Sequence, residues 1–213
     1  MSLKLRRARK GDEESFLRVK KRLPMPSSPQ ESARGGFLLG TNVETYRFYI
    51  ENSYANVLEN DGEIVGFAII LPDALLRRSD LWRRKNEIEW ENGAPTDLLD
   101  KPLCYFEQLA VLPGAKNRFY GVSLAFATLR QAFEKHEAVF ATLVVEPVFN
   151  PASIPFLESV GASRVAAVDE FLPEFGNLVS AVYSLEREVF AERIGRHRLA
   201  AKIIRQIETV GEF

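Results

Sequence analysis

The residues with the clearest chemical potential lie in one stretch, residues 106 to 127, which reads FEQLAVLPGAKNRFYGVSLAFA. An apolar, strand-like run meets Pro113-Gly114, and a basic turn and a helix-like run follow. The first N–H groups of a helix have no partner within it, and the macrodipole places partial positive charge there. This strand, turn and helix therefore predict an anion site of the kind that binds diphosphate-bearing cofactors.

The turn itself carries the pattern R-x-x-G-x-S over residues 118 to 123. We expect Arg118 to supply positive charge and Gly121 to let the backbone approach a phosphate closely. Main-chain N–H groups of Tyr120, Val122 and Ser123 would complete the cradle. The alternative is an ordinary basic loop before a helix that binds no ligand.

A single carboxylate, Glu107, interrupts the apolar strand predicted over residues 103 to 112. The period of two places its side chain on the same face as Leu109 and Val111. A charge at such a position costs free energy if it is buried unpaired. Glu107 is therefore either solvated or salt-bridged, or it is a functional carboxylate able to take a proton from an ammonium group.

The R-x-x-G-x-S pattern resembles the R/Q-x-x-G-x-G/A coenzyme A motif of the GNAT superfamily of N-acyltransferases. Ser123 replaces the last Gly or Ala, and the segment between Val111 and Arg118 is longer than is usual in the family. The order of predicted elements also resembles the GNAT fold, over residues 3 to 185. The resemblance implies that main-chain groups of Leu109 and Val111 pair with the pantetheine arm of an acyl-CoA.

A second motif, Asn150-Pro151-Ala152-Ser153 before Phe156, is similar to the N-x-x-(A/S)-x-x-F helix start of the family. The resemblance implies that Asn150 reaches the pantetheine or its thiol end, with Ser153 beside it. The alternative is that Asn150 simply caps a helix, which needs no ligand.

The catalytic residues that the resemblance implies are a general base and a general acid. Glu107 stands where the family often has its base. The family often has a Tyr after Phe156 to protonate the leaving thiolate, but this chain has Leu157. Tyr183, Tyr105 and Ser153 are the substitutes, and we place Tyr183 with Glu107 as the candidate catalytic pair.

The elements that must position these residues follow from periodicity and from turn signals. Strands are predicted over residues 3–8, 54–59, 63–71, 103–112, 138–145, 163–169 and 178–185. Helices are predicted from Asp12, as a cap, to before Pro24, and over residues 43–52, 120–135, 151–161 and 186–209. Asp61-Gly62 between two apolar runs indicates a hairpin.

This order predicts an α/β (α+β) fold with a mixed, mostly antiparallel central sheet flanked by helices. Residues 1–185 would form a GNAT-like acyltransferase domain with a helical insert at 73–101, and residues 186–213 a C-terminal helical extension. Trp82 and Trp90 of the insert would wall a substrate cleft, or else anchor the insert to the sheet. The terminal helix would dock on its own domain or form a homodimer contact.

Composition excludes several classes of partner. Lys and Arg number 28 against 29 Asp and Glu, so neither nucleic acid nor a membrane surface is indicated. The one cysteine, Cys104, allows no internal disulfide, and the first residues contain no apolar signal core. We therefore expect a cytoplasmic protein. Histidines 136 and 197 are expected at the surface, and no metal site is indicated.

The function predicted from these features is acyl-CoA-dependent N-acyl transfer, with acetyl-CoA as donor and a small-molecule or peptide amine as acceptor. The donor would lie in a V-shaped opening between the strand that ends at Val111 and the one that begins near Ala138. The amine would enter from the other side, near the loop 23–40 and the insert. Two alternatives stay open: a non-catalytic acyl-CoA-binding regulatory domain, and a GNAT-fold interaction or structural protein that has lost the cofactor.

Overall fold

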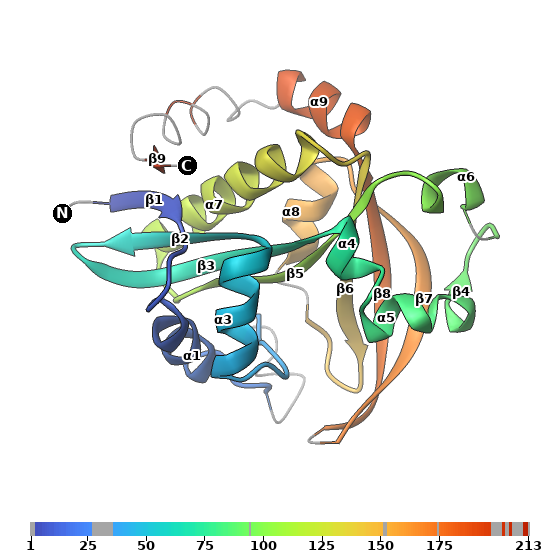
Figure 1. Cartoon of the computed structure of the whole chain (residues 1–213), viewed down its shortest axis with the longest axis horizontal. Coiled ribbons are helices and arrows are strands. Elements are labelled where there is room, and N and C mark those ends of the chain that lie inside the picture. The colour runs from blue at the N-terminus through green and yellow to red at the C-terminus, as the bar shows by residue number, and fades with distance from the viewer. Residues whose placement is uncertain are drawn as a thin grey trace.

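The computed structural model describes residues 3–26, 36–93, 95–150, 153–173, 175–196, 202, 205 and 211–212. Within these residues, strands form one sheet in the order β4-β7-β8-β6-β5-β3-β2-β1-β9 (Figure 1). The strands are β1 (Leu3–Arg7), β2 (Tyr54–Asn60), β3 (Glu63–Pro72), β4 (Glu89–Trp90), β5 (Leu103–Val111), β6 (Ala138–Glu146), β7 (Ser163–Leu172), β8 (Gly176–Glu186) and β9 (Gly211–Glu212). Within this sheet only β5–β6 and β1–β9 pair in parallel, which confirms the predicted mixed, mostly antiparallel sheet.

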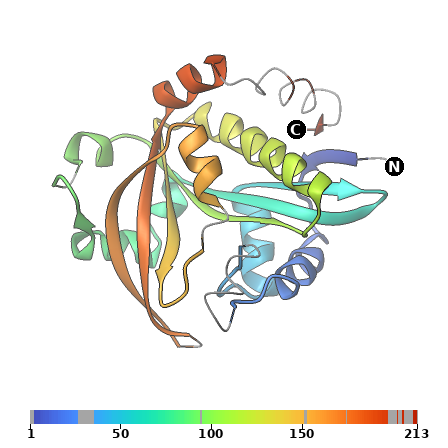
Figure 2. The same cartoon turned by 180° about the vertical axis from the view of Figure 1, so that it is seen from behind.

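Helices cover both faces of the sheet. One face carries α1 (Glu13–Lys21), α3 (Val43–Asn52) and the short helices of the insert, which are α4 (Asp73–Leu76), α5 (Asp80–Arg83), η1 (Lys85–Glu87) and α6 (Thr96–Leu99) (Figure 1). The other face carries α7 (Ala115–Phe133), α8 (Ile154–Ser159) and α9 (Arg187–Arg196), as the view from behind shows (Figure 2). We call these the α3 face and the α7 face.

Three aromatic side chains fix α1 and α3 to the sheet. Phe16 of α1 stacks on Phe67 of β3 at 4.2 Å between ring centroids, and Tyr46 of α3 meets both rings edge-on. All three are fully buried. Burial of a large apolar side chain stabilises a fold by about 1.5–3 kcal/mol, so this cluster holds α3 firmly over the middle of the sheet.

On the α7 face, Phe126 of α7 contacts Phe156 of α8 and Phe190 of α9, with centroid distances of 5.9 and 5.6 Å. Phe190 also lies 4.9 Å from Phe133 and is only 4% exposed. The sequence left open whether the terminal helix docks on its own domain or on a second copy. The part of it that forms α9 packs against its own chain.

Turn and cap residues in the sequence predict the position of the β2–β3 hairpin and the start of α1. Asp61 and Gly62 join β2 to β3 with positive φ angles of 50° and 86°, as the predicted hairpin requires. Asp12 does stand before α1, but its carboxylate makes no cap to the helix. It accepts two hydrogen bonds from Arg6, at 2.7 and 3.2 Å, because that buried guanidinium needs a counter-charge.

Two elements differ from the sequence prediction. The insert is not only helix and loop, because Glu89 and Trp90 form the strand β4 beside β7. Gly211 and Glu212 lie in the predicted C-terminal helical extension, but they form the strand β9, which pairs with β1. Short elements of this kind depend on a distant partner, which a local pattern does not contain. The predicted start of α8, at residue 151, lies outside the described residues, and α8 as described begins at Ile154.

The start of α7 also differs, and it bears directly on the predicted anion site. The helix begins at Ala115, not near Tyr120. Gly114 precedes it with a φ of 151°, a value that favours glycine. Ala115 and Lys116 are good helix formers. The longer segment between Val111 and Arg118 therefore forms the first residues of α7.

The middle of the sheet opens between β5 and β6. Their parallel pairing runs only from Leu103↔Ala138 to Phe106↔Ala141, although β5 continues to Val111 and β6 to Glu146. Figure 1 shows the two strands running apart beyond this point. The predicted V-shaped opening is therefore present, because beyond Phe106 and Ala141 the two strands no longer pair with each other.

Candidate active site

The site is organised by a bulge in β5. Ile69 of β3 pairs with Gln108, but the next residue, Ile70, pairs with Phe106, so Glu107 is the extra residue. A bulge interrupts the alternation of side chains along a strand. The prediction that Glu107 shares a face with Leu109 and Val111 is therefore wrong.

The contacts of these residues show which face each occupies. Tyr49 of α3 lies near Glu107 and, as a hydrogen-bond partner, lowers the pKa of its carboxyl group. Val111 instead meets Gly121 of α7, where a Cβ added to the glycine would lie 2.9 Å from a valine Cγ. The carboxylate thus points to the α3 face, at the start of the opening, and Val111 to the α7 face.

The surroundings of Glu107 tune it as a base. Burial and, next, the charge of Glu170 on β7 raise its pKa to about 7, while the hydrogen bond from Tyr49 opposes this rise. A carboxylate with such a pKa is half ionised near neutral pH, which suits a general base. Burial and then the Glu107 charge raise the pKa of Tyr46, Tyr49 and Tyr105, so these hydroxyls stay protonated.

A buried amide lies next to the bulge. Gln108 is 7% exposed; its Oε1 accepts from the Tyr46 hydroxyl at 2.8 Å and its Nε2 donates to Thr41 Oγ1 at 2.9 Å. Thr41 has a φ of 63°, which is rare for a β-branched residue. Its carbonyl also accepts from Lys20 Nζ at 2.9 Å. These bonds fix the entry to α3 against the bulged strand.

The opening on the other side is bordered by Asn150. Its backbone N–H donates to the carbonyl of Val144, in the part of β6 that no longer pairs with β5. Its Nδ2 donates to the carbonyl of Phe37 at 3.2 Å. Its Oδ1 is buried and has no hydrogen-bond partner among the described residues. An unsatisfied buried amide oxygen is a place for a donor N–H.

The predicted cofactor residues border this opening. Leu109 and Val111 pair with Ala68 and Gly66 of β3 along one edge of β5, and β6 leaves the other edge unpaired. Ser153 stands at the N-cap of α8, without a side-chain cap. An open strand edge and an orphaned amide oxygen suit a ligand with both amide N–H and C=O groups, so these residues fit a pantetheine arm.

Because α7 begins at Ala115, the N–H groups predicted to bind phosphate do not lie at the start of the helix. The N–H groups left without an intrahelical acceptor are those of the first turn, which begins at Ala115. The N–H groups from Tyr120 to Ser123 follow that turn, and Ser123 is completely buried. Gly121 brings the helix close to β5. The side chain of Arg118 lies outside the described part of the chain.

Tyr183 is not brought together with Glu107. It lies on β8, where it pairs with Ala141 of β6, and it is 8% exposed in the core. Its neighbour Val182 packs on the α3 face with the insert, so Tyr183 points to the α7 face. Burial and then Glu158 of α8 raise its pKa. The two members of the candidate catalytic pair therefore face opposite sides of the sheet.

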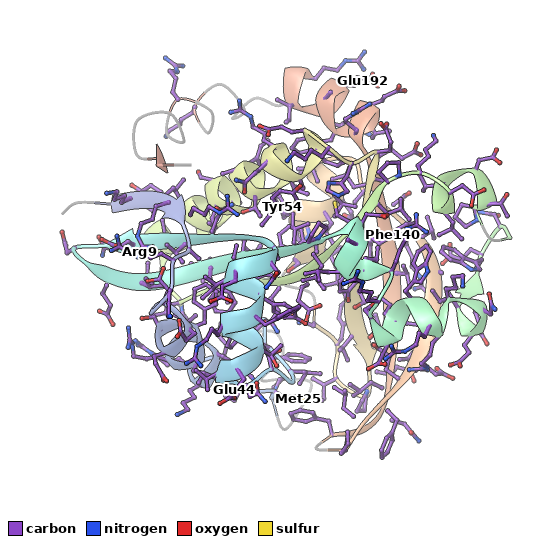
Figure 3. All side chains as sticks on the ribbon, in the orientation of Figure 1. Arg9, Met25, Glu44, Tyr54, Phe140 and Glu192 are labelled. Carbon is purple, nitrogen blue, oxygen red and sulfur yellow. The ribbon has the colours of Figure 1, made fainter. Side chains whose placement is uncertain are left out.

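The two tryptophan rings of the insert pack against neighbouring side chains of the sheet and of the insert itself. Trp90 meets Phe140 of β6 edge-on at 6.2 Å, and Figure 3 labels Phe140 where the insert meets the sheet. Trp82 lies under the cations of Arg77 and Lys85, at 4.6 and 5.5 Å from the ring. Trp82, Trp90 and Tyr105 line one apolar hollow. The insert thereby walls the α3 face next to Glu107.

A larger cavity of about 510 Å³ lies at the end of β6, β7 and β8. Its charged lining consists of Glu146, Asp169, Glu170 and Arg84. Ser180 donates to Glu170 at 2.6 Å. Arg84 already bonds to Glu87 and to the carbonyl of Asp169. The cavity is therefore acidic, and through Glu170 it adjoins the candidate base.

Sequence reasoning missed three residues of this site: Tyr49, Gln108 and Glu170. Their spacing along the chain carries no motif, since each comes from a different element. The aromatic character of residues 46 to 49 was visible in the sequence. Only the packing of α3 over the bulge shows that one of these rings reaches Glu107.

The remaining candidate groups lie outside the site. His136 is not a surface residue as expected, because it is 5% exposed, with Nδ1 at 2.9 Å from the Ala132 carbonyl and Nε2 accepting from the Asp73 N–H. His197 lies outside the described residues.

Burial raises the pKa of the Cys104 thiol, which makes it a poor nucleophile. Across the described ranges, no group of three or more His, Cys, Asp or Glu residues could hold a metal ion.

No helix within the described residues is both long and apolar enough to cross a membrane. No curated protein matches the chain in sequence.

Solved structures with a similar fold include acetyltransferases. The ribosomal-protein-S18-alanine N-acetyltransferase of Escherichia coli matches with a TM-score of 0.57 at 12% identity, covering 86% of this chain and 93% of that one. The ribosomal-protein-alanine N-acetyltransferase of Brucella melitensis gives 0.55 at 17%, covering 85% and 98%. Arabidopsis thaliana NAA60 in complex with acetyl-CoA gives 0.57 at 14%, covering 87% and 99%. At these identities the likeness shows the fold.

Family membership follows from the sequence match. The model of the acetyltransferase (GNAT) family matches residues 29–162, which is more than half of the chain. The acetyl donor of this family is acetyl-CoA. With its opened sheet, its bulged fifth strand and this match, the chain belongs to the acetyltransferase (GNAT) family.

Proposed function

We propose that this protein is an acetyl-CoA-dependent N-acetyltransferase that acetylates a primary amine of a small molecule or a peptide. One observation supports this most directly. A carboxylate with a pKa of about 7 sits at a strand bulge where the sheet opens. Carboxyl groups with strongly raised pKa values cluster at functional sites, which favours a catalytic role for Glu107.

The donor would be held along the opening. Main-chain groups of Leu109 and Val111 offer an unpaired strand edge, and Asn150 offers a buried acceptor, with Ser153 beside it. The start of α7 would face the diphosphate, with Arg118 as the cation, and Tyr120, Gly121, Val122 and Ser123 would follow as the next residues of the helix. When bound, acetyl-CoA supplies an acetyl group activated as a thioester.

Glu107 is the base. A protonated amine must lose a proton before its nitrogen can attack the thioester carbon, and Glu107 accepts this proton, directly or through a water molecule. The new C–N bond replaces the C–S bond, and the second proton of the nitrogen leaves with the thiolate. Tyr49 holds the carboxylate in place, and Gln108 fixes the strand next to it.

The amine would approach from the α3 face. Glu107 points to that face, and the insert with Trp82 and Trp90 forms one wall of it. Leu157 is buried in the core, and Tyr183 faces the opposite side of the sheet. We therefore do not retain Tyr183 as the acid.

The first test is calorimetric titration of acetyl-CoA and CoA into the protein, with Arg118→Glu as the control. We expect micromolar binding that the variant loses. A panel of amines, followed by release of free thiol, then tests turnover, and Glu107→Gln should keep binding while losing most of the turnover. No binding at millimolar ligand would overturn the proposal, and binding without turnover of any amine would favour the regulatory alternative.

A further inference from the structure

The chain segment from Gly36 to Asn42, here called the bridging segment, is tied to both sides of the opening. At one end, Thr41 accepts a hydrogen bond from Gln108 of β5 at 2.9 Å. At the other end, the carbonyl of Phe37 accepts from Asn150 Nδ2 at 3.2 Å. β5 and the loop after β6 are the two walls of the opening. The bridging segment therefore links them on the side that Glu107 faces.

The two ends of the bridging segment are held unequally. Thr41 is tied by Gln108 and by Lys20, and its positive φ persists because these bonds hold it. Near the other end, Leu38 N–H donates to the Leu23 carbonyl at 3.2 Å and the Phe37 ring is buried, but among the described residues the Phe37 carbonyl accepts only the long bond from Asn150. The Phe37 end is therefore the end that a change at Asn150 would move.

Asn150 uses only one end of its side-chain amide. The Nδ2 end holds Phe37, whereas the Oδ1 end is buried with no partner among the described residues. Leaving a buried acceptor unsatisfied costs free energy. A ligand that brings an N–H group to Oδ1 recovers this free energy and, because the amide is planar and rigid, fixes the orientation of Nδ2 as well.

We propose that Asn150 is a positioning residue that couples the acyl carrier to the amine side of the site, by holding the bridging segment through Phe37 while its Oδ1 accepts from the carrier. The inference rests on the proposed function, since it takes the carrier to be coenzyme A. A coupling of this kind is reciprocal, so carrier and amine strengthen each other's binding by the same factor. The carrier therefore orders the wall against which the amine binds.

The test separates the two ends of the amide. Asn150→Asp keeps an oxygen acceptor but places a carboxylate oxygen against the Phe37 carbonyl, which repels it. Asn150→Ala removes both ends. Hydrogen exchange of the peptide covering residues 36–42 is measured with and without CoA, together with calorimetric CoA binding and the KM for an amine that the wild type acetylates.

In the wild type, we expect CoA to slow exchange in the bridging segment by about tenfold, a coupling of ordinary size. In Asn150→Asp this slowing is lost and the KM for the amine rises by about tenfold, with kcat changed far less. Affinity of the free enzyme for CoA falls by no more than about the coupling factor. Asn150→Ala also loses the slowing, and it loses more CoA affinity than Asn150→Asp does.

Asn52→Asp is the matched control. Asn52 Nδ2 donates to the Phe48 carbonyl at 2.9 Å at the end of α3, and it is exposed. Glu44 marks the opposite end of this helix, next to the bridging segment, in Figure 3. The same chemical change at Asn52 should leave exchange, KM and CoA binding as in the wild type.

The outcomes distinguish this inference from the proposed function. If the wild type binds CoA and exchange in the bridging segment does not change, or if CoA slows that exchange in Asn150→Asp and Asn150→Ala as much as in the wild type, the coupling is overturned while the transferase proposal stands. If the wild type does not bind CoA, both are overturned. Should Asn150→Asp unfold, as thermal denaturation would show, Asn150→Ala carries the same comparison.

Discussion

Gly121 of α7 and Val111 of β5 are packed so closely that a Cβ on the glycine would lie 2.9 Å from the Cγ2 of the valine. The approach brings the second turn of the helix against the last residue of the strand that borders the opening. The sequence predicts that Gly121 lets the backbone approach a phosphate closely. In the structure it also lets the helix approach the strand.

Gly121→Ala should destabilise the protein despite the higher helix propensity of alanine. Overpacking costs about 1–3 kcal/mol, and the propensity gain offsets up to about 1 kcal/mol, so we expect a net loss of about 1 kcal/mol. Urea denaturation measures it. Val111→Ala removes the clashing methyl, and the double variant should therefore be more stable than the sum of the single changes. Strict additivity would contradict the contact.

The pH dependence of activity should follow Glu107. The base must be ionised, so kcat/KM rises as pH passes through about 7. Glu170→Gln removes a neighbouring negative charge and should move this rise to lower pH. Tyr49→Phe removes the hydrogen bond that favours the carboxylate and should move it to higher pH.

The controls for these pH profiles are Glu158→Gln and Tyr54→Phe. Neither residue is among the groups that perturb Glu107. Both profiles should match that of the wild type. Shifts in the same direction for Glu170→Gln and Tyr49→Phe would contradict the assignment of Glu107 as the base.

Stability should also depend on pH through Glu107. Its folded pKa of about 7 lies above the ordinary 4.5, so between these values the folded state binds the proton more tightly than the unfolded chain does. The stability present at low pH is therefore lost as pH rises through about 7, by at most about 3 kcal/mol. Glu107→Gln should match the wild type near pH 4 and exceed it in stability at pH 8, by chemical denaturation.

Phe190 tests the docking of α9 on its own chain. Phe190→Ala should lower the free energy of unfolding by about 3–5 kcal/mol, because a buried ring is replaced by a cavity. Phe171→Ala is the control, since that ring is 65% exposed and should change stability by less than about 0.5 kcal/mol. Equal melting temperatures for both variants would show that α9 does not stabilise this domain.

Elements with a local cause could be predicted from the sequence. The hairpin at Asp61-Gly62 and the helix α3 appear where turn chemistry and periodicity place them. The opening between β5 and β6 was expected from the resemblance to the GNAT fold. The start of α7 was missed because Pro113-Gly114 marks a break in the strand without showing how soon a helix can begin after it.

The site could be predicted only in part, because the bulge at Glu107 has no local pattern. The residues Phe106 to Leu109 read equally well as a regular strand, and the pairing with Ile69 and Ile70 decides otherwise. One inserted residue turned Glu107 away from Val111 and toward Tyr49. Glu170 was also missed, since the predicted strand ended one residue before it.

The short pairing between β5 and β6 also bears on how the chain folds. β2–β3 and β7–β8 are antiparallel pairs whose partners are close in sequence, whereas Leu103 to Phe106 must find partners 35 residues further on. Contacts with small sequence separation form faster than distant ones. We therefore expect the two hairpins to form early and the four residue pairs between β5 and β6 to form late. The opening would then take its final shape only when the two halves of the domain pack together.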